Sequence, residues 1–200
     1  MPPLGPRDAL ILVDVQNDFL PCGSLAVPGG DAVVPVLDDY VRSAVAAGAH
    51  VFATRDWHPP GHCSFRERGG PWPAHCVQGT RGAELAGGLH LPSGVLVVSK
   101  GSEPDRDAYS GFDGTKLDAC LRARHVERVL VGGLATDRCV LQTVRDARAN
   151  GFTVLLLDDA IRGLQPAASA AAREEMIASG AIPVTLESLP RAEATGGRSA

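Results

Sequence analysis

Four chemically distinctive side chains stand at or near the ends of four apolar runs in the sequence. Three of the runs end in Asp14, Asp56 and Lys100, and the fourth ends in two glycines, six residues before Cys139. Taken singly, each acid could cap a turn and the lysine could be an ordinary solvated charge. If the runs are parallel strands, however, their carboxyl ends meet at one edge of the sheet. Two acids, a lysine and a thiol gathered there could support a sulfur nucleophile.

Cys139 lies at the start of a predicted helix over 138–150. A helix N-terminus and a neighbouring lysine both favour the thiolate. Main-chain N–H groups after Gly132 and Gly133 could form an oxyanion hole. The total of five cysteines is odd and the sequence has no C-x-x-C, which argues against a disulfide framework. We expect the remaining cysteines to be inert: Cys22, Cys63, Cys76 and Cys120.

A second cluster lies in the segment 57–93, which is rich in Gly, Pro, His and Trp and has no clear period. Asp56 and His58 stand two residues apart at a strand end, and His75 follows further along. One carboxylate and two imidazoles suit a divalent transition metal with open positions. The spacing D-x-H is common, so the pattern alone is weak. Three other histidines are interpreted as ordinary polar residues: His50, His90 and His125.

These side chains must be positioned by the elements around them. Six β-branched, nearly continuously apolar runs predict strands buried on both faces, at 9–14, 50–56, 95–100, 128–133, 153–159 and 182–186. Helical spacing between the runs predicts helices at 31–48, 115–124, 138–150 and 166–179. The alternation predicts a single α/β domain over 1–190: a doubly wound, mostly parallel six-stranded sheet with helices on both faces. Residues 57–93 form a loop insertion, and 191–200 are expected to be a frayed tail.

Charge and motif content exclude several classes of function. The net charge is −4 with no basic block, so nucleic acid is not expected as a partner. The longest apolar runs have about six residues, far below the roughly 20 that span a bilayer. The N-terminus has no basic region followed by an apolar stretch, and we expect a cytoplasmic protein. The sequence has no P-loop, no dinucleotide fingerprint and no G-x-S-x-G elbow.

Five motifs in order give the chain a specific resemblance. They are "LVDVQNDF", "TRDWHPPGHCSF", "GPWPAHCVQGTRGAEL", "VVSKG" and "VGGLATDRCV". Together they resemble nicotinamidases of the isochorismatase-like cysteine hydrolase superfamily. Members that hydrolyse isochorismate generally lack the metal-binding Asp and His, so these motifs favour the nicotinamidase branch.

The resemblance implies roles for particular residues. It implies a catalytic triad of Asp14, Lys100 and Cys139, and metal ligands Asp56, His58 and His75. A fourth protein ligand varies within the family, with three candidates here: His62, Ser64 and Glu67. The pyridine ring would lie among three aromatic side chains: Phe19, Trp72 and Tyr109. A cis peptide would fall at Leu134–Ala135 and would direct the Ala135 N–H, with that of Cys139, at the oxyanion.

The implied reaction is hydrolysis of nicotinamide, and of pyrazinamide, through a thioester, with one divalent metal (Zn, Fe or Mn) as cofactor. NAD recycling is the physiological role that free nicotinamide suggests. Two alternatives stay open: a related amidase acting on another small amide, and a non-catalytic metal-binding domain of the same fold. The expected partner is a small molecule, with neither nucleic acid nor membrane, and homo-oligomerisation is left open.

Overall fold

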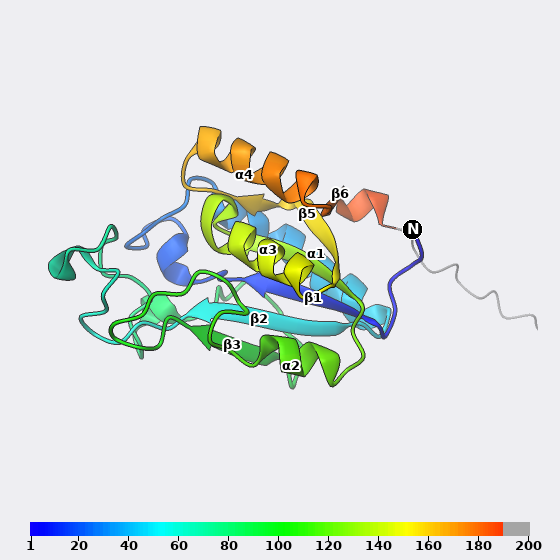
Figure 1. Ribbon diagram of the computed structural model, residues 1–200, viewed down its shortest axis with the longest axis horizontal. Coiled ribbons are helices and arrows are strands. Elements are labelled where there is room, and N and C mark those ends of the chain that lie inside the picture. The colour runs from blue at the N-terminus through cyan, green and yellow to red at the C-terminus, as the bar shows by residue number, and fades with distance from the viewer. Residues whose placement is uncertain (190–200) are drawn as a thin grey trace, which may run out of the picture.

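A computed structural model describes residues 1–189 of the protein. These residues form one six-stranded sheet in the order β3-β2-β1-β4-β5-β6, in which every adjacent pair is parallel (Figure 1). The strands are β1 (Asp8–Val13), β2 (His50–Asp56), β3 (Leu96–Lys100), β4 (Arg128–Leu134), β5 (Thr153–Arg162) and β6 (Ile182–Val184). The predicted doubly wound α/β fold is therefore confirmed.

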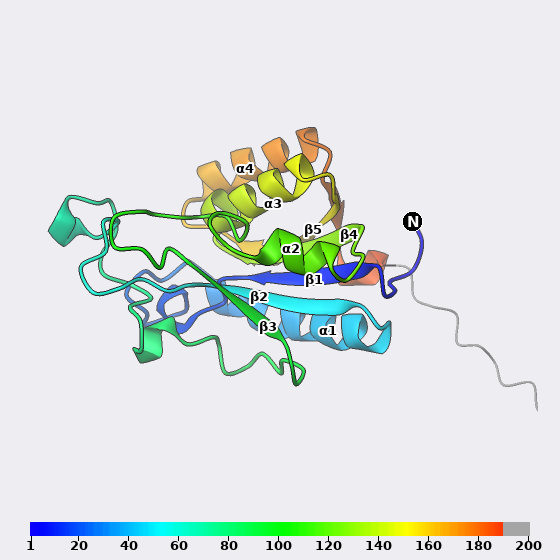
Figure 2. The same ribbon diagram turned by 60° about the horizontal axis from the view of Figure 1, so that its bottom comes forward.

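Helices cover both faces of the sheet. The helices are α1 (Val33–Ala46), α2 (Leu117–Arg122), α3 (Leu141–Ala149) and α4 (Pro166–Ala178). Figure 2 places α1 on one side of the strands and the other three helices on the opposite side. Each face has its own core cluster: Leu37 and Tyr40 of α1 belong to one, and Leu117 and Val144 of α2 and α3 belong to the other.

The sequence explains these elements locally. In α1 the buried side chains recur at helical spacing, from Val33 through Leu37 to Ala44. The chain turns after α1 at Gly48, whose φ of 71° favours glycine. Helix α4 begins with Pro166 at its first position, where the missing N–H costs no hydrogen bond. The central strands β1 and β4 are buried along their whole length, as continuous apolar runs predict.

The strand order places a topological switch point between β1 and β4. The chain proceeds from β1 through β2 to β3 on one side, then crosses back to β4 and continues to β5 and β6 on the other. In open α/β sheets a crevice forms outside the carboxyl ends of the strands at this point. Asp14 follows β1 directly and Cys139 follows β4, so both lie at this crevice.

The segment 57–93 holds two short 3₁₀ turns, Arg66–Arg68 and Arg81–Ala83, and is otherwise irregular. Its first part lies beyond the carboxyl ends of the strands, on the left of Figure 1. No helix within residues 1–189 is long and apolar enough to cross a membrane. The tail predicted for 191–200 lies outside the described residues.

Candidate functional site

The Lys100 ammonium is the centre of the proposed catalytic cluster. Its Nζ lies 2.7 Å from Asp14 Oδ2, 2.5 Å from Asp56 Oδ1 and 3.4 Å from Cys139 Sγ. One carboxylate oxygen of each acid and the sulfur lie within 4.8 Å of one another. All four side chains are buried, although they come from the ends of three strands and the turn after a fourth. The structure thus brings together the acids, the lysine and the thiol that the sequence placed at one edge.

Asp14 is held by the strand beside it. The Thr54 hydroxyl of β2 donates a 2.6 Å hydrogen bond to Asp14 Oδ1, and the Asp14 N–H faces the Thr54 carbonyl at 3.3 Å. The φ of Asp14 is 48°, a left-handed conformation that aspartate adopts more readily than most residues. This turn ends β1 and keeps the carboxylate at the edge of the sheet, with its second oxygen toward Lys100.

Burial and the charges in this cluster set the protonation of its members. Although burial alone would lower the pKa of Lys100, the carboxylates of Asp14 and Asp56 hold it well above its usual value. Burial raises the pKa of Asp14 despite the pull of Lys100. For Asp56 burial would raise the pKa, but Lys100 and His58 together outweigh it and the pKa is lowered. The cluster therefore combines a lysine that stays protonated with a carboxylate, that of Asp14, which is more basic than usual.

The pKa of Cys139 differs from the expectation drawn from its place at a helix start. Burial raises the pKa of the thiol, and the opposing effect of Lys100 does not restore it. The turn that carries it also differs from the predicted α-helix over 138–150. Residues Thr136–Val140 form a π-helical turn, in which Val140 N–H reaches Ala135 O at 3.2 Å, and α3 begins only at Leu141. The sulfur thus rests as a thiol beside a base.

Three side chains form a candidate metal centre beside this cluster. Asp56 Oδ2 lies 3.8 Å from His58 Nε2 and 4.0 Å from His75 Nε2. His58 Nδ1 donates to the Gly101 carbonyl at 2.9 Å, and His75 Nδ1 donates to the Pro73 carbonyl at 2.8 Å. These bonds fix both tautomers with the Nε2 lone pairs toward the carboxylate, an arrangement typical of metal-bound histidine. The donor set fits a divalent transition metal.

The three candidates for a fourth protein ligand are placed differently. The His62 ring stacks on His58 with centroids 4.1 Å apart, but its Nε2 donates to the Arg106 carbonyl at 3.1 Å. Its Nδ1 lies 2.8 Å from the Ser64 hydroxyl. Both ring nitrogens of His62 are thus engaged, and the Ser64 hydroxyl faces His62. The Glu67 side chain is exposed, in the Arg66–Arg68 turn. The three side chains that the resemblance implied, Asp56, His58 and His75, lie together, and His62 lies in a second such group with His58 and Asp107.

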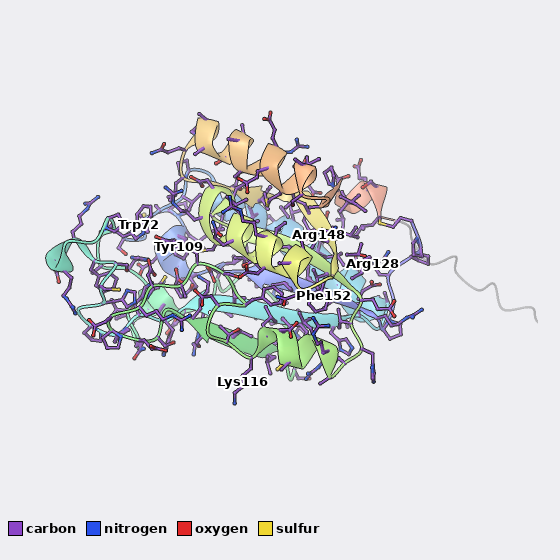
Figure 3. The ribbon with its side chains drawn as sticks, viewed as in Figure 1. Trp72, Tyr109, Lys116, Arg128, Arg148 and Phe152 are labelled. Atoms are coloured by element: carbon purple, nitrogen blue, oxygen red, sulfur yellow. The ribbon has the colours of Figure 1, made fainter. Side chains whose placement is uncertain are left out.

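A narrow cleft opens beside both clusters. Its lining includes the predicted aromatic residues and three members of the polar clusters: Phe19, Trp72, Tyr109, Asp56, His75 and Cys139. Trp72 Nε1 donates to the Tyr109 hydroxyl at 3.0 Å, and both side chains lie at the loop end of the molecule (Figure 3). A flat apolar wall, a thiol and a metal centre therefore share one small cavity, which suits a planar aromatic amide.

The peptide Leu134–Ala135 is cis, as the resemblance implied. Ala135 lines the cleft next to Cys139. The backbone N–H groups of these two residues are the predicted donors of an oxyanion hole.

Sequence reasoning missed several residues that support or line the site. Gln16 Nε2 donates to the Asp56 carbonyl at 2.8 Å, and Gln16 Oε1 accepts from the Asp56 N–H at 2.8 Å, so this amide clamps the end of β2. The available signal was its place in "DVQNDF", just after an apolar run that predicts a buried strand. A glutamine buried at that point needs polar partners for its amide. Four further residues line the cleft: Leu25, Val27, Arg138 and Leu164. These four residues belong to no motif or regular spacing, so the sequence alone gave no sign that they line a cleft.

The chain is similar to a known domain family and to several characterised proteins. The isochorismatase domain matches residues 8–188. The chain is 41% identical over 204 residues to the nicotinamidase of Escherichia coli (strain K12), covering 90% of this chain and 96% of that protein. It is 44% identical over 176 residues to the nicotinamidase/pyrazinamidase of Mycobacterium tuberculosis, covering 84% of this chain and 93% of that protein.

Two solved structures are also similar. A pyrazinamidase of Pyrococcus horikoshii in complex with zinc has a TM-score of 0.88 and 50% identity, with 90% of this chain and 99% of that chain covered. A protein of L. infantum in complex with nicotinate has a TM-score of 0.86 and 39% identity, with 96% of this chain and 99% of that chain covered.

Proposed function

The chain belongs to the isochorismatase family, and from that premise we propose that it is a nicotinamidase, which hydrolyses nicotinamide to nicotinate and ammonia. Pyrazinamide, a similar planar amide, is expected to be a second substrate. One observation carries the proposal: the Asp14–Lys100–Cys139 cluster and the Asp56–His58–His75 centre meet at one aromatic cleft. The relatives with the same domain include nicotinamidases at 41% and 44% identity.

The proposed reaction begins with proton transfer from the Cys139 thiol to Asp14. The raised pKa of Asp14, which burial causes, makes this carboxylate a better acceptor for a thiol proton. Lys100, 3.4 Å from the sulfur, stabilises the thiolate as it forms. The thiolate then attacks the carbonyl carbon of the amide. The N–H groups of Ala135 and Cys139 receive the developing oxyanion, each donor typically contributing about 3 kcal/mol.

The tetrahedral intermediate collapses when the C–N bond breaks. Asp14 returns the proton to the leaving nitrogen, and ammonia departs, leaving a thioester on Cys139. Asp14 next takes a proton from a water molecule, and the resulting hydroxide attacks the thioester carbon. The C–S bond breaks, nicotinate is released, and the sulfur recovers its proton. Lys100 keeps its charge throughout, because the two carboxylates hold its pKa well above the working range.

Asp56, His58 and His75 are the proposed ligands of a divalent metal, with zinc, iron and manganese all compatible with the mixed nitrogen and oxygen donors. When bound, such an ion supplies a Lewis acid that can anchor the pyridine nitrogen, directly or through water. The chain's own residues orient the ring: Phe19, Trp72 and Tyr109 line the cleft. The cytoplasmic location and the absence of nucleic-acid and membrane partners stay predictions.

Ammonia release from nicotinamide by the purified protein tests the proposal, with metal analysis on the same sample. We expect turnover of nicotinamide and pyrazinamide and little turnover of a non-aromatic amide such as propionamide. Comparable turnover of propionamide would assign the site to another amidase of the family. Release of no ammonia from any amide by metal-loaded protein would favour a non-catalytic metal-binding domain.

A further inference from the structure

Arg138 is an uncompensated cation in the wall of the cleft. Its side chain is exposed and lines the cleft next to Cys139. The guanidinium carbon lies 5.5 Å from the centre of the Trp72 ring, and its NH1 donates to the Asp137 carbonyl at 2.9 Å. Within residues 1–189 it forms no ion pair, whereas many other surface arginines do. A free guanidinium at the opening of a mostly apolar cleft can attract an anion from solvent.

The other cation of the site cannot have this role. Lys100 is fully buried between Asp14 and Asp56, at 2.7 and 2.5 Å, and these acids neutralise it.

The proposed reaction changes the charge of the molecule in the cleft. The substrate amide is neutral and the product is a carboxylate, so substrate and product respond differently to Arg138. We propose that Arg138 is a specificity-determining residue that recognises the aromatic carboxylate product at the cleft opening. Attraction by the guanidinium retains nicotinate there and makes the enzyme sensitive to its own product. This inference rests on the proposed function.

The inference predicts that a change at Arg138 affects binding of the charged product more than binding of the neutral substrate, and one ratio measures this difference. The measured quantity is the inhibition constant of nicotinate divided by the KM of nicotinamide, with ammonia release as the assay. Arg138→Gln removes the charge, so the ratio rises about threefold or more. Arg138→Lys keeps the charge but replaces the guanidinium beside Trp72 by an ammonium, so the ratio stays close to that of the unmodified protein. In the unmodified protein, raising NaCl from about 0.05 to about 0.5 M raises the ratio too, because salt screens an exposed charge.

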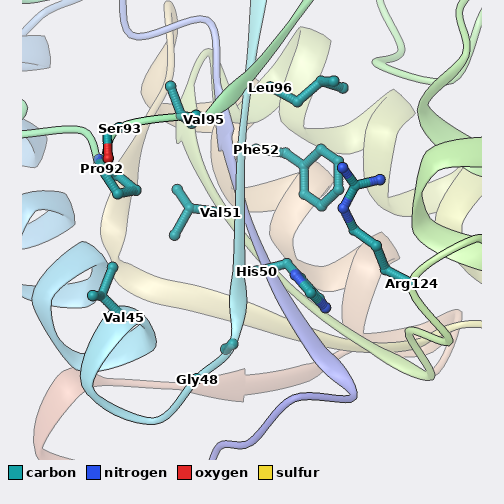
Figure 4. A pocket seen from close by; sticks show the side chains of 12 residues that line it. Val45, Gly48, His50, Val51, Phe52, Pro92, Ser93, Val95, Leu96 and Arg124 are labelled. Atoms are coloured by element: carbon teal, nitrogen blue, oxygen red, sulfur yellow. The ribbon is translucent and has the colours of Figure 1, made fainter.

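Arg124→Gln is the matched control. Arg124 is exposed and lies at the opposite end of β2, beside a separate groove with Phe52, Pro92 and Leu96 (Figure 4). Loss of this arginine leaves the ratio unchanged. An unchanged ratio in Arg138→Gln overturns the inference, as does an equal rise in Arg138→Gln and Arg138→Lys. The salt series applies the same test to the unmodified protein, where a ratio insensitive to salt counts against it. Failure to hydrolyse nicotinamide at all would instead reject the proposed function.

Discussion

At the scale of single residues, the sulfur of Cys139 is the group on which the proposed chemistry depends. Cys139→Ala should lower kcat for nicotinamide by about 10⁴-fold or more, because no other group in the cleft can form the thioester. The side chain is small and buried, so the fold should persist. Ammonia release measures the loss, and circular dichroism checks the fold. Cys120→Ala, on α2 and away from the cleft, is the control and should keep full activity.

Asp14→Asn separates the two effects of the carboxylate. It removes the proton acceptor, so kcat should fall by about 10²–10⁴-fold. It also removes a negative charge that, after burial, helps to raise the pKa of Cys139. The thiol pKa should therefore fall, and iodoacetamide should label Cys139 faster near neutral pH than in the unmodified protein. Labelling at the rate of the unmodified protein would contradict the assigned effect of the Asp14 charge on the pKa of the thiol.

The sequence predicted Asp14, Asp56 and Lys100 because each stands at the end of an apolar run that predicts a buried strand. Gln16 and Thr54 were not predicted, because their roles are hydrogen bonds to neighbouring strands. Gln16 reaches the backbone of Asp56, forty residues away, and Thr54 reaches the carboxylate of Asp14. Partners so distant in sequence follow from strand order, which the apolar runs alone did not give.

At the scale of elements, periodicity predicted where the helices lie, but it did not predict the π-helical turn at the start of one of them. Leu141, Val144 and Ala147 gave α3 its buried face, and that face is present. The preceding turn is wider because the Ala135 carbonyl accepts from both Arg138 and Val140 N–H groups, at 3.0 and 3.2 Å. Strand β5 extends to Arg162, beyond the predicted end at 159, because its last residues pair with Gly133 and Leu134 of β4.

A carboxylate of helix α1 binds the backbone of the irregular segment near its end. Asp38 Oδ1 accepts from the His90 N–H at 2.8 Å, and this bond is the main cause of the lowered pKa of Asp38. Asp38→Asn should lower the free energy of unfolding at pH 7 by about 1 kcal/mol, because bonds to a charged acceptor are the stronger ones. Urea unfolding of both proteins measures the difference.

The pH dependence of that difference has a definite sign. A folded pKa below the unfolded value of 3.8 means that ionised Asp38 stabilises the fold above about pH 4. The stabilisation is lost as the pH falls through the folded pKa, so the two proteins should converge toward pH 3. Asp39→Asn is the control: Asp39 pairs with Arg42 at the surface, and its loss should cost less than about 0.5 kcal/mol. A difference that grows on acidification would exclude the assigned role of Asp38.

At the scale of the whole molecule, two irregular segments, one within 57–93 and one after β3, bind each other beyond the carboxyl ends of the strands, and together they form part of the site. The Cys63 N–H donates to the Pro104 carbonyl at 2.8 Å, and Arg68 pairs with Asp105 at 2.8 Å. The hydrogen bond from Trp72 to Tyr109 joins the same two segments in the wall of the cleft. No periodic pattern in 57–93 could predict the path of this segment, because contacts with a second irregular segment determine it.

The metal centre combines contributions from the same distant segments, so its loss should be measurable in binding as well as in rate. His75→Ala removes one of two imidazoles and should weaken zinc affinity by at least about 100-fold, measured by competition with a chromophoric chelator. The KM for nicotinamide should rise more than kcat falls, because the proposed ion anchors the ring and does not contact the scissile carbonyl. His50→Ala, at the far end of β2, should change neither quantity. Dialysis against a chelator should reproduce the effect of His75→Ala on KM, and added zinc should reverse it. Unchanged kinetics in protein verified to be metal-free would remove the ion from substrate binding and leave the cleft's aromatic side chains as the sole anchor.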